Sequence, residues 1–437
     1  MSDRSLAALI NDEHIGTLRE SNGLWSFQYT EAWLGRPDRF SLSPHLPLGI
    51  GSIVDQGSQR PVQWYFDNLL PEEGQRALLA KDAKLEYADA FGLLAFYGAE
   101  SAGSVTLLPE NEQSQATEEW HPLSDAALSK RIRQMPHVPL AQNAVKRMSL
   151  AGAQHKLAVV MVNGQLFEPA GAAPSTHILK PDHPDKDYAH SVVNEWFVMQ
   201  LAKRLGLDVP PVYRRYVPEP VYLIERFDRI NKNGQSWQRQ HVIDACQLLG
   251  LDRQFKYQQG SMENLAKLAE ACRSKALART RLFEWLVFNL LVGNNDAHLK
   301  NLSFLVGTGG DIQLAPHYDL LSTASYESRA YEKTNWPENC TLSWPICGSK
   351  HFSEINRNVL IDAGSILGLN KITAERFIEK LRSNITPVSE ALYAELETEN
   401  AQLKAEKPDL ALTLAGEERC VRVINRTVIS EMVGRLQ

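Results

Sequence analysis

The stretch VGNNDAHLKNLSF, residues 292–304, decides how this sequence is interpreted. It begins at the end of the apolar run LFEWLVFNLLVG, residues 282–293, which has the composition of a core helix. The stretch contains three asparagines, an aspartate, a histidine and a lysine. A surface turn needs only one or two polar residues with Gly or Pro. We therefore interpret the stretch as part of a functional site that directly follows a core helix.

Asp296 and Asn301 have the D-x-x-x-x-N spacing of a kinase catalytic loop, in which the Asp accepts the proton of the substrate hydroxyl and the Asn binds magnesium. That spacing is common by chance, and a capped loop is the simpler alternative. Downstream, Asp319 follows the strand-like segment IQLA, where a kinase places its second magnesium-binding carboxylate. A carboxylate and an amide suit Mg²⁺, although Asp319 could instead cap the segment LLSTASY.

The stretch from Lys146 to Asp228 has the order of elements expected of a nucleotide-binding lobe. The small-residue loop SLAGAQHK (149–156) precedes an apolar strand and an Asn-Gly hairpin turn, and its backbone N–H groups could approach phosphate oxygens. The next strand carries Lys180, and a helix with apolar residues at helical spacing carries Glu195. In a kinase such a lysine contacts the nucleotide phosphates and such a glutamate holds the lysine.

The segment LIERFDR (223–229) ends the strand-rich half of the chain. Beyond Asp228 almost all of the sequence indicates helix, apart from short apolar pieces around NLSFLV and DIQLAP that flank the opening stretch. In a two-lobed kinase the connecting segment lines the adenine pocket with backbone groups, which makes Glu225, Arg226 and Phe227 the candidates. An ordinary strand end with a surface Glu-Arg pair is the alternative.

The composition limits the function classes. A formal net charge of −6 argues against a surface that binds nucleic acid throughout, so any such role must be local or indirect. The N-terminus lacks the pattern of a signal peptide and no long apolar run occurs, so we expect a cytoplasmic protein without a membrane role. The five cysteines are scattered without CxxC spacing and indicate buried reduced thiols.

The length of 437 residues predicts several domains. The polar, aromatic-free segment ENEQSQATEE (110–119) suggests a linker. We expect an N-terminal module over residues 1–110, a strand-rich nucleotide-binding lobe over 120–228 and a helical catalytic lobe over 229–437. The expected fold class is α+β.

A divalent-metal hydrolase is a competing interpretation. Imidazole and carboxylate groups bind such metals well, and Asp296, His298, His317 and Asp319 would supply them. No histidine pair has the compact H-x-x-x-H spacing, which disfavours this interpretation.

Taken together, the motifs resemble those of the HipA toxin kinases, the serine/threonine kinases of bacterial toxin–antitoxin modules. The resemblance rests on FDNLLPE, GSVTLLP, SLAGAQHK, HILKP, ERFDR, NNDAHLKN and YDLLS, which occur in this order over nearly the whole chain. It implies a two-lobed, protein-kinase-like fold that uses ATP and Mg²⁺.

The resemblance also implies roles for individual residues. Ser149 would be phosphorylated by the kinase itself, and the added charge would repel ATP phosphates and silence the enzyme. Asp296 would be the catalytic base, and Asn301 and Asp319 the magnesium ligands. The implied nucleotide-binding residues are Ala151, Gly152, Ala153, Gln154, His155, Lys156, Lys180, Glu225, Arg226, Phe227, His298, Leu299, Lys300, Asn301, Tyr318 and Asp319.

The family resemblance further implies partners. It predicts a dimeric helix-turn-helix antitoxin of the HipB type, which would carry the toxin to operator DNA. It also predicts a translation component as the phosphorylated target, of the aminoacyl-tRNA synthetase class and glutamyl-tRNA synthetase in particular. A rival from another class is a catalytically idle corepressor that binds only antitoxin and DNA.

Overall fold

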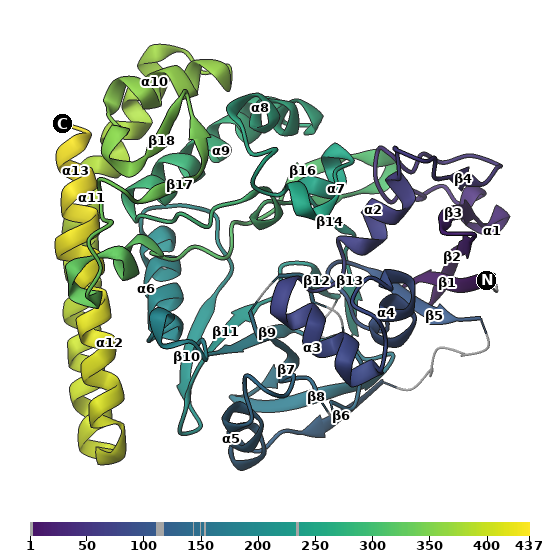
Figure 1. Cartoon of the computed structure of the whole chain (residues 1–437), viewed down its shortest axis with the longest axis horizontal. Helices are drawn as coiled ribbons and strands as arrows, with labels where there is room; N and C mark the ends of the chain where they lie inside the picture. The colour runs from purple at the N-terminus through teal and green to yellow at the C-terminus, as the bar shows by residue number, and fades with distance from the viewer. Residues whose placement is uncertain (1–2, 111–117, 143, 149, 153, 233–235) are drawn as a thin grey trace. The chain divides into compact units, whose positions relative to one another are not determined.

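The computed structural model describes residues 3–110, 118–142, 144–148, 150–152, 154–232 and 236–437. It divides into two compact units (Figure 1). The first unit comprises Met1–Pro181, Leu223–Phe255 and Ser303–Ala315, and the second comprises Asp182–Tyr222, Lys256–Leu302 and Pro316–Gln437.

The first unit begins with an antiparallel sheet in the order β4-β3-β2-β1-β5. Its strands are β1 (Arg4–Ile10), β2 (Glu13–Ser21), β3 (Leu24–Tyr29), β4 (Ile53–Val54) and β5 (Val105–Pro109). Two-residue turns, Asn11–Asp12 and Asn22–Gly23, join β1 to β2 and β2 to β3. All four turn residues have positive φ, as type I′ hairpins require.

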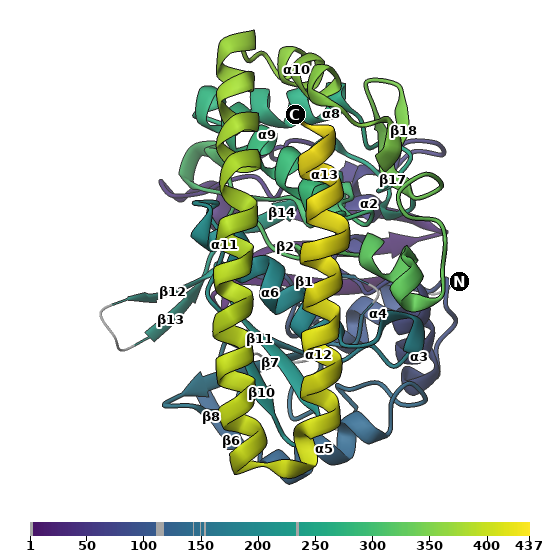
Figure 2. The ribbon, with the colours of Figure 1, turned by 90° about the vertical axis from the view of Figure 1, so that its left-hand side faces the viewer.

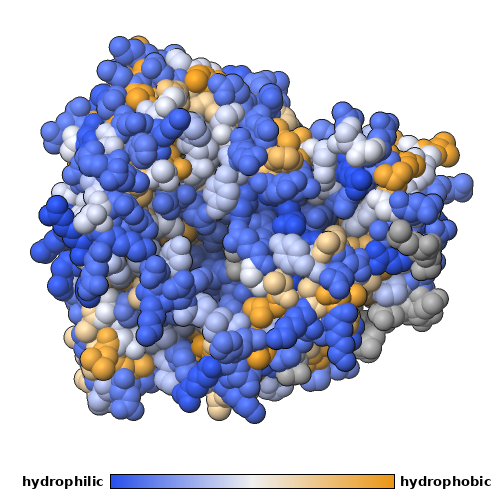
Figure 3. Space-filling view, in the orientation of Figure 1, coloured by the Kyte–Doolittle hydropathy of each residue, from blue (hydrophilic) through white to orange (hydrophobic). Residues whose placement is uncertain are grey.

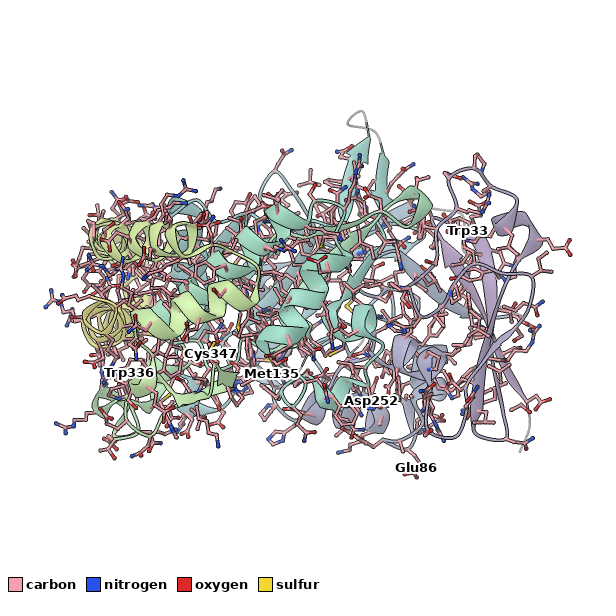
Figure 4. The ribbon with its side chains drawn as sticks, turned by 90° about the horizontal axis from the view of Figure 1, so that it is seen from above. Trp33, Glu86, Met135, Asp252, Trp336 and Cys347 are labelled. Carbon is pink, nitrogen blue, oxygen red and sulfur yellow. The ribbon has the colours of Figure 1, made fainter. Side chains whose placement is uncertain are left out.

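Helices cover this sheet and form its core. They are α1 (Glu31–Leu34), α2 (Pro61–Asp67) and α4 (Ala90–Tyr97), while α3 (Glu73–Ala83) packs against α4. Phe66 of α2 lies 5.5 Å from Phe27 between ring centroids, and Phe91 of α4 lies 5.2 Å from Trp25. Trp33 of α1, labelled in Figure 4, is buried against Phe40. Helix α2 begins with Pro61 at its first position, where proline is favoured.

A second sheet contains the Asn-Gly hairpin predicted from the sequence. Within the first unit its order is β11-β9-β7-β8-β6. By residue number, β10 and the first half of β11 belong to the second unit. The hairpin turn Asn163–Gly164 has positive φ at both residues, which confirms the prediction. The elements are β6 (Glu118–Pro122), α5 (Asp125–Arg133), β7 (Leu157–Val162), β8 (Gln165–Gly171), β9 (His177–Pro181), β10 (Val212–Tyr216) and β11 (Pro220–Glu225).

The prediction of helix beyond Asp228 is wrong for the short segments at 229–232, 236–239 and 242–244, which form strands, whereas the apolar pieces NLSFLV and DIQLAP do contain strands. The hairpin of β12 (Arg229–Lys232) and β13 (Ser236–Arg239) stands beside a three-stranded sheet in the order β14-β15-β16. That sheet and its flanking helices belong to the first unit: β14 (Val242–Asp244), α7 (Ala245–Leu249), η2 (Arg253–Phe255), β15 (Ser303–Val306), η4 (Thr308–Gly310) and β16 (Ile312–Leu314). Strands of three or four residues carry too little alternation to be seen in the sequence.

The second unit is mainly helical. Its longest helix, α11 (Lys371–Glu406), runs beside α12 (Ala411–Val423), a π-helical turn (Ile424–Ile429) and α13 (Ser430–Arg435), as Figure 2 shows. The other α-helices are α6 (Ser191–Arg204), α8 (Met262–Ala271), α9 (Lys275–Leu291) and α10 (Arg357–Ile366). A hairpin of β17 (Thr341–Ile346) and β18 (Ser349–His351) completes the unit, with short 3-10 turns at 186–188, 299–301, 324–327, 329–331, 352–354 and 408–410.

The helices and antiparallel sheets together confirm the predicted α+β class. All five cysteines are free, and Cys347 is the exposed one. Polar residues cover most of the face seen in Figure 3, with hydrophobic residues in small groups. Within the described residues, no helix has the length and apolar character needed to cross a membrane. The three predicted domain boundaries stay a prediction, and most of the proposed linker lies outside the described residues.

Candidate active site

The polar stretch 292–304 folds into a loop between α9 and β15, and its side chains form hydrogen bonds to its own backbone. The Asn301 amide Nδ2 donates to the carbonyl oxygen of Asp296 at 2.9 Å. The backbone N–H of Asp296 donates to Oδ1 of Asn294 at 3.0 Å, and Asn294 Nδ2 donates to Asn289 of α9 at 2.7 Å. The asparagines therefore fix the backbone of Asp296 from both sides, which explains why the stretch is so polar.

Gly293 makes the turn from α9 into this loop possible. Its φ is +67°, a conformation that favours glycine. A Cβ at this position would lie 2.5 Å from Val428 Cγ1 and 3.0 Å from Ala324 Cβ. The helix can end here, and deliver Asp296 three residues later, only because the position lacks a side chain.

Tyr257, a residue that the sequence analysis did not single out, contacts this loop from another segment of the chain. Its hydroxyl donates a hydrogen bond to Asp296 Oδ1, and its ring lies edge-on to His298 with 5.0 Å between centroids. The neighbouring Lys256 carbonyl accepts the backbone N–H of Leu299 at 3.2 Å. No sequence pattern links Tyr257 to Asp296, because the two lie far apart along the chain and meet only through the fold.

Asp319 lies in the same unit with Glu195. Burial, together with the charges of Glu195 and Asp319, raises the pKa of the Tyr222 hydroxyl well above its usual value. The Tyr318 hydroxyl donates to the carbonyl oxygen of Lys300 at 2.9 Å. The backbone of Asp319 has φ +57°, a costly conformation for a residue with a side chain and one that clusters at functional sites.

His317 is a core residue and does not behave as a metal ligand. Burial lowers its pKa to about 3, and its ring stacks on Trp285 at 6.5 Å between centroids. In the described part of the chain, no group of three or more His, Cys, Asp or Glu residues is arranged to hold a metal ion. These observations weigh against the metal hydrolase.

The donor set does fit Mg²⁺ held together with a nucleotide. Because Asn301 Nδ2 is used by the loop backbone, the amide presents Oδ1 as its ligand atom. Asp319 supplies a carboxylate from a separate segment. Mg²⁺ is usually bound through one or two such groups plus substrate phosphates and water.

The predicted phosphate loop belongs to the first unit, where the N-terminal segment holds it. Pro71 pairs with Gly152 in a parallel bridge, and the backbone N–H of Glu72 donates to the Gly152 carbonyl at 3.2 Å. Lys156 Nζ donates to the carbonyl of Ala151 at 2.5 Å. Gly152 has φ +108°, so glycine is required there. Ser149 and Ala153 lie outside the described residues.

The remaining predicted residues of the nucleotide site are placed as follows. Lys180 is buried in β9, and Glu225 ends β11. The backbone N–H of Arg226 donates to the Thr176 carbonyl at 2.9 Å, which continues the sheet pairing past β11.

The side chain of Arg226 enters a buried ionic cluster that the sequence did not predict. We define the Glu100 cluster by its six members, all in the first unit: Glu100, Lys146, Arg226, Asp228, Arg229 and Arg239. Glu100 is fully buried and contacts the four cations at 2.9–3.2 Å. Asp228 accepts two hydrogen bonds from the Arg226 guanidinium, at 2.9 and 2.7 Å.

Charge controls the protonation states inside this cluster. Burial raises the pKa of Glu100, but the charges of Arg239, Lys146, Arg229 and Arg226 outweigh it and hold the pKa well below its ordinary value. Burial and the charge of Arg226 lower the pKa of Arg229 to about 10. The carboxylates are therefore ionised. Each is needed to balance the buried positive charge, because the cations outnumber the carboxylates.

Comparison with known proteins identifies the family of this chain. The HipA-like C-terminal domain matches residues 148–388, and the HipA N-terminal domain matches residues 6–108. The chain belongs to the family of HipA-type toxin kinases. It is 36% identical over 320 residues to the protein Y4mE of Sinorhizobium fredii, covering 70% of this chain and 74% of that one. It is 32% identical over 324 residues to the serine/threonine-protein kinase toxin HipA of Shewanella oneidensis, covering 69% and 71%.

A solved structure agrees with the family assignment. The chain matches HipA in the complex of Shewanella oneidensis HipA, HipB and operator DNA with a TM-score of 0.75 and 25% identity, over 98% of this chain and 99% of that one. The predicted kinase-like fold of the HipA family is thereby confirmed. The roles assigned to individual residues stay predictions.

Proposed function

We propose that this chain is an ATP- and Mg²⁺-dependent protein serine/threonine kinase that acts as the toxin of a toxin–antitoxin pair. The observation that carries the proposal is the fixed geometry of the loop from Asp296 to Asn301, with Asp319 in the same unit. Relatives named as a kinase toxin support the reaction class.

In the proposed reaction the Asp296 carboxylate accepts the proton of a serine or threonine hydroxyl. As this proton leaves, the hydroxyl oxygen forms its bond to the γ-phosphorus, the bond from that phosphorus to the β–γ bridging oxygen breaks, and ADP departs with the electron pair. Lys180 and the loop of residues 151–156 bind the phosphates, and the backbone of residues 225–227 contacts the adenine. Asn301 and Asp319 would hold Mg²⁺, which would neutralise the charge on the phosphates.

The first experiment is intact-mass spectrometry of the purified chain before and after incubation with Mg²⁺-ATP. We expect a gain of one phosphoryl group that peptide mapping assigns to Ser149. Asp296→Ala and Asp319→Ala should lower the rate by at least about a hundred-fold, because the base and the charge neutralisation are lost. Asp409→Ala, at an exposed aspartate of the second unit, is the matched control and should keep the wild-type rate.

The outcome separates the two candidate functions. Turnover at the wild-type rate in Asp296→Ala would refute the assigned role. No phosphoryl gain in wild-type protein that starts unphosphorylated, even with protein substrates, would favour the catalytically idle corepressor.

The proposed partner is a HipB-type helix-turn-helix antitoxin dimer, which brings the chain to operator DNA. It is supported by the matched structure, whose own complex contains HipB and operator DNA. We propose an aminoacyl-tRNA synthetase, of the glutamyl-tRNA synthetase class, as the substrate. Incubating that synthetase with this chain and Mg²⁺-ATP, followed by mass spectrometry, tests the substrate, and absence of phosphorylation would exclude it.

A further inference from the structure

The hydrogen bonds to the backbone of Asp296 do not by themselves set the rotation of its carboxylate. Asn294 and Asn301 fix the backbone of Asp296, as described above. Rotation of a carboxylate about χ2 is broad and is not confined by the backbone. A proton acceptor must present an oxygen to the substrate hydroxyl within hydrogen-bond reach, so this rotation matters for the reaction.

Tyr257 contacts this carboxylate directly, since its hydroxyl donates to Asp296 Oδ1. The tyrosine is itself fixed by its surroundings in the second unit. Its carbonyl accepts the backbone N–H of Gly260 at 2.9 Å, and the carbonyl of Lys256 accepts Leu299 N–H at 3.2 Å. The turn that carries the tyrosine is therefore attached directly to the loop that carries the aspartate.

Trp344 of β17 joins the same two segments from another side. Its indole Nε1 donates to the carbonyl of Ala297 at 3.1 Å, and it is buried. Gly260 packs so closely against it that a Cβ there would lie 2.5 Å from Trp344 Cγ. The turn and the loop thus contact the same buried tryptophan, which fixes the backbone from which the exposed Tyr257 side chain reaches Asp296.

We infer that Tyr257 is a positioning residue of the phosphoryl-transfer reaction, which acts by fixing the rotation of the Asp296 carboxylate. This inference rests on the proposed role of Asp296 as the catalytic base. It predicts a change in the rate of the chemical step without a change in nucleotide binding, because Tyr257 acts on the proton acceptor.

Tyr257→Phe tests the inference, because it removes the hydroxyl and keeps the ring against His298. We expect the rate of phosphoryl transfer at saturating ATP to fall by about ten- to a hundred-fold, part of the contribution of a general base. The ATP concentration for half-maximal rate should stay within about two-fold. Tyr97→Phe is the matched control, since the Tyr97 hydroxyl donates to Asp82 at 2.7 Å in the other unit, and it should leave the rate unchanged.

A second measurement does not depend on activity. Tyr257→Phe, Asp296→Asn and the double variant form a thermodynamic cycle in thermal unfolding, which isolates the interaction between the two side chains. We expect a non-zero coupling between the two substitutions. Additive unfolding temperatures, or a Tyr257→Phe rate equal to wild type, would overturn the inference. Coupling without any phosphoryl transfer in wild-type protein would instead overturn the proposed function and with it the catalytic meaning of the contact.

Discussion

Replacing Glu100 by glutamine is expected to be among the most damaging conservative substitutions in the first unit. The carboxylate is fully buried and contacts Lys146 and three arginines, while Ser175 also donates to it at 2.8 Å. Glutamine has nearly the same shape but no charge. In the Glu100 cluster the four cations would then have only Asp228 as a carboxylate partner.

The magnitude follows from the burial. Removing one partner of a buried ion pair typically costs about 3–5 kcal/mol, since the other charge stays buried without compensation. A whole domain has only about 5–15 kcal/mol of stability. For a unit of roughly two hundred residues this loss corresponds to a fall in unfolding temperature of about 6–20 °C.

Urea denaturation at pH 7, with an independent thermal melt, is the assay. The matched control is Glu395→Gln, because Glu395 also accepts two hydrogen bonds from one arginine, Arg204, at 2.6 and 2.7 Å. That pair is on the surface, where an ion pair contributes at most about 1 kcal/mol. If Glu100→Gln and Glu395→Gln had equal effects, the argument from burial would be refuted.

The pH dependence gives a second check on the same substitution. The folded protein holds the pKa of Glu100 well below the ordinary value of about 4.3, so the carboxylate stabilises the fold fully above that pH. The contribution is lost as the pH falls from about 4 toward the folded pKa. The difference in stability between wild type and Glu100→Gln should therefore shrink when both are compared at pH 3. A difference that stays constant between pH 7 and pH 3 would contradict the electrostatic explanation.

Two further substitutions test other parts of the first unit. Gly152→Ala should raise the ATP concentration for half-maximal phosphoryl transfer, because φ is +108° and the added Cβ would clash with the Lys156 side chain. Gly164→Ala is the control, because Gly164 also has a positive φ, +76°, but has no atom near the added Cβ. Burial lowers the pKa of His241 to about 4. Its neutral form therefore stabilises the fold above the unfolded pKa of about 6.5. This contribution, at most about 3 kcal/mol, is lost as the pH falls toward 4. His241→Gln should reduce the change of the urea midpoint with pH between pH 6.5 and 4.5. A pH dependence equal to that of the wild type would rule out this role of His241.

Features that depend on neighbours in the chain were predictable from the sequence. The Asn163–Gly164 turn, the helix around Glu195 and the polar loop after α9 each follow from a local pattern, and the structure contains all three. The D-x-x-x-x-N spacing was informative because a single loop carries both residues, so their separation along the chain fixes their distance in space.

Features that depend on distant contacts were not predictable. Tyr257 and Asp296 are brought together by two separate segments, and the members of the Glu100 cluster come from four regions of the chain. Isolated charged residues usually lie on the surface, so their sequence context gave no reason to expect burial. The strands β12 to β14 were missed for a related reason, because each is too short to show a pattern before its partner is known.

The Glu100 cluster and the bridge at Gly152 lead to the same conclusion about the N-terminal part of the chain. Glu100 and Pro71 both lie within residues 6–108, which match the HipA N-terminal domain. Their partners Arg226 and Gly152 lie within residues 148–388, which match the C-terminal domain. Without the N-terminal part, the four cations would lose one of their two carboxylates, and the loop at Gly152 would lose its backbone pairing. The N-terminal domain therefore supplies contacts that hold the segments which we propose bind ATP. These contacts explain physically why all of these residues belong to one compact unit.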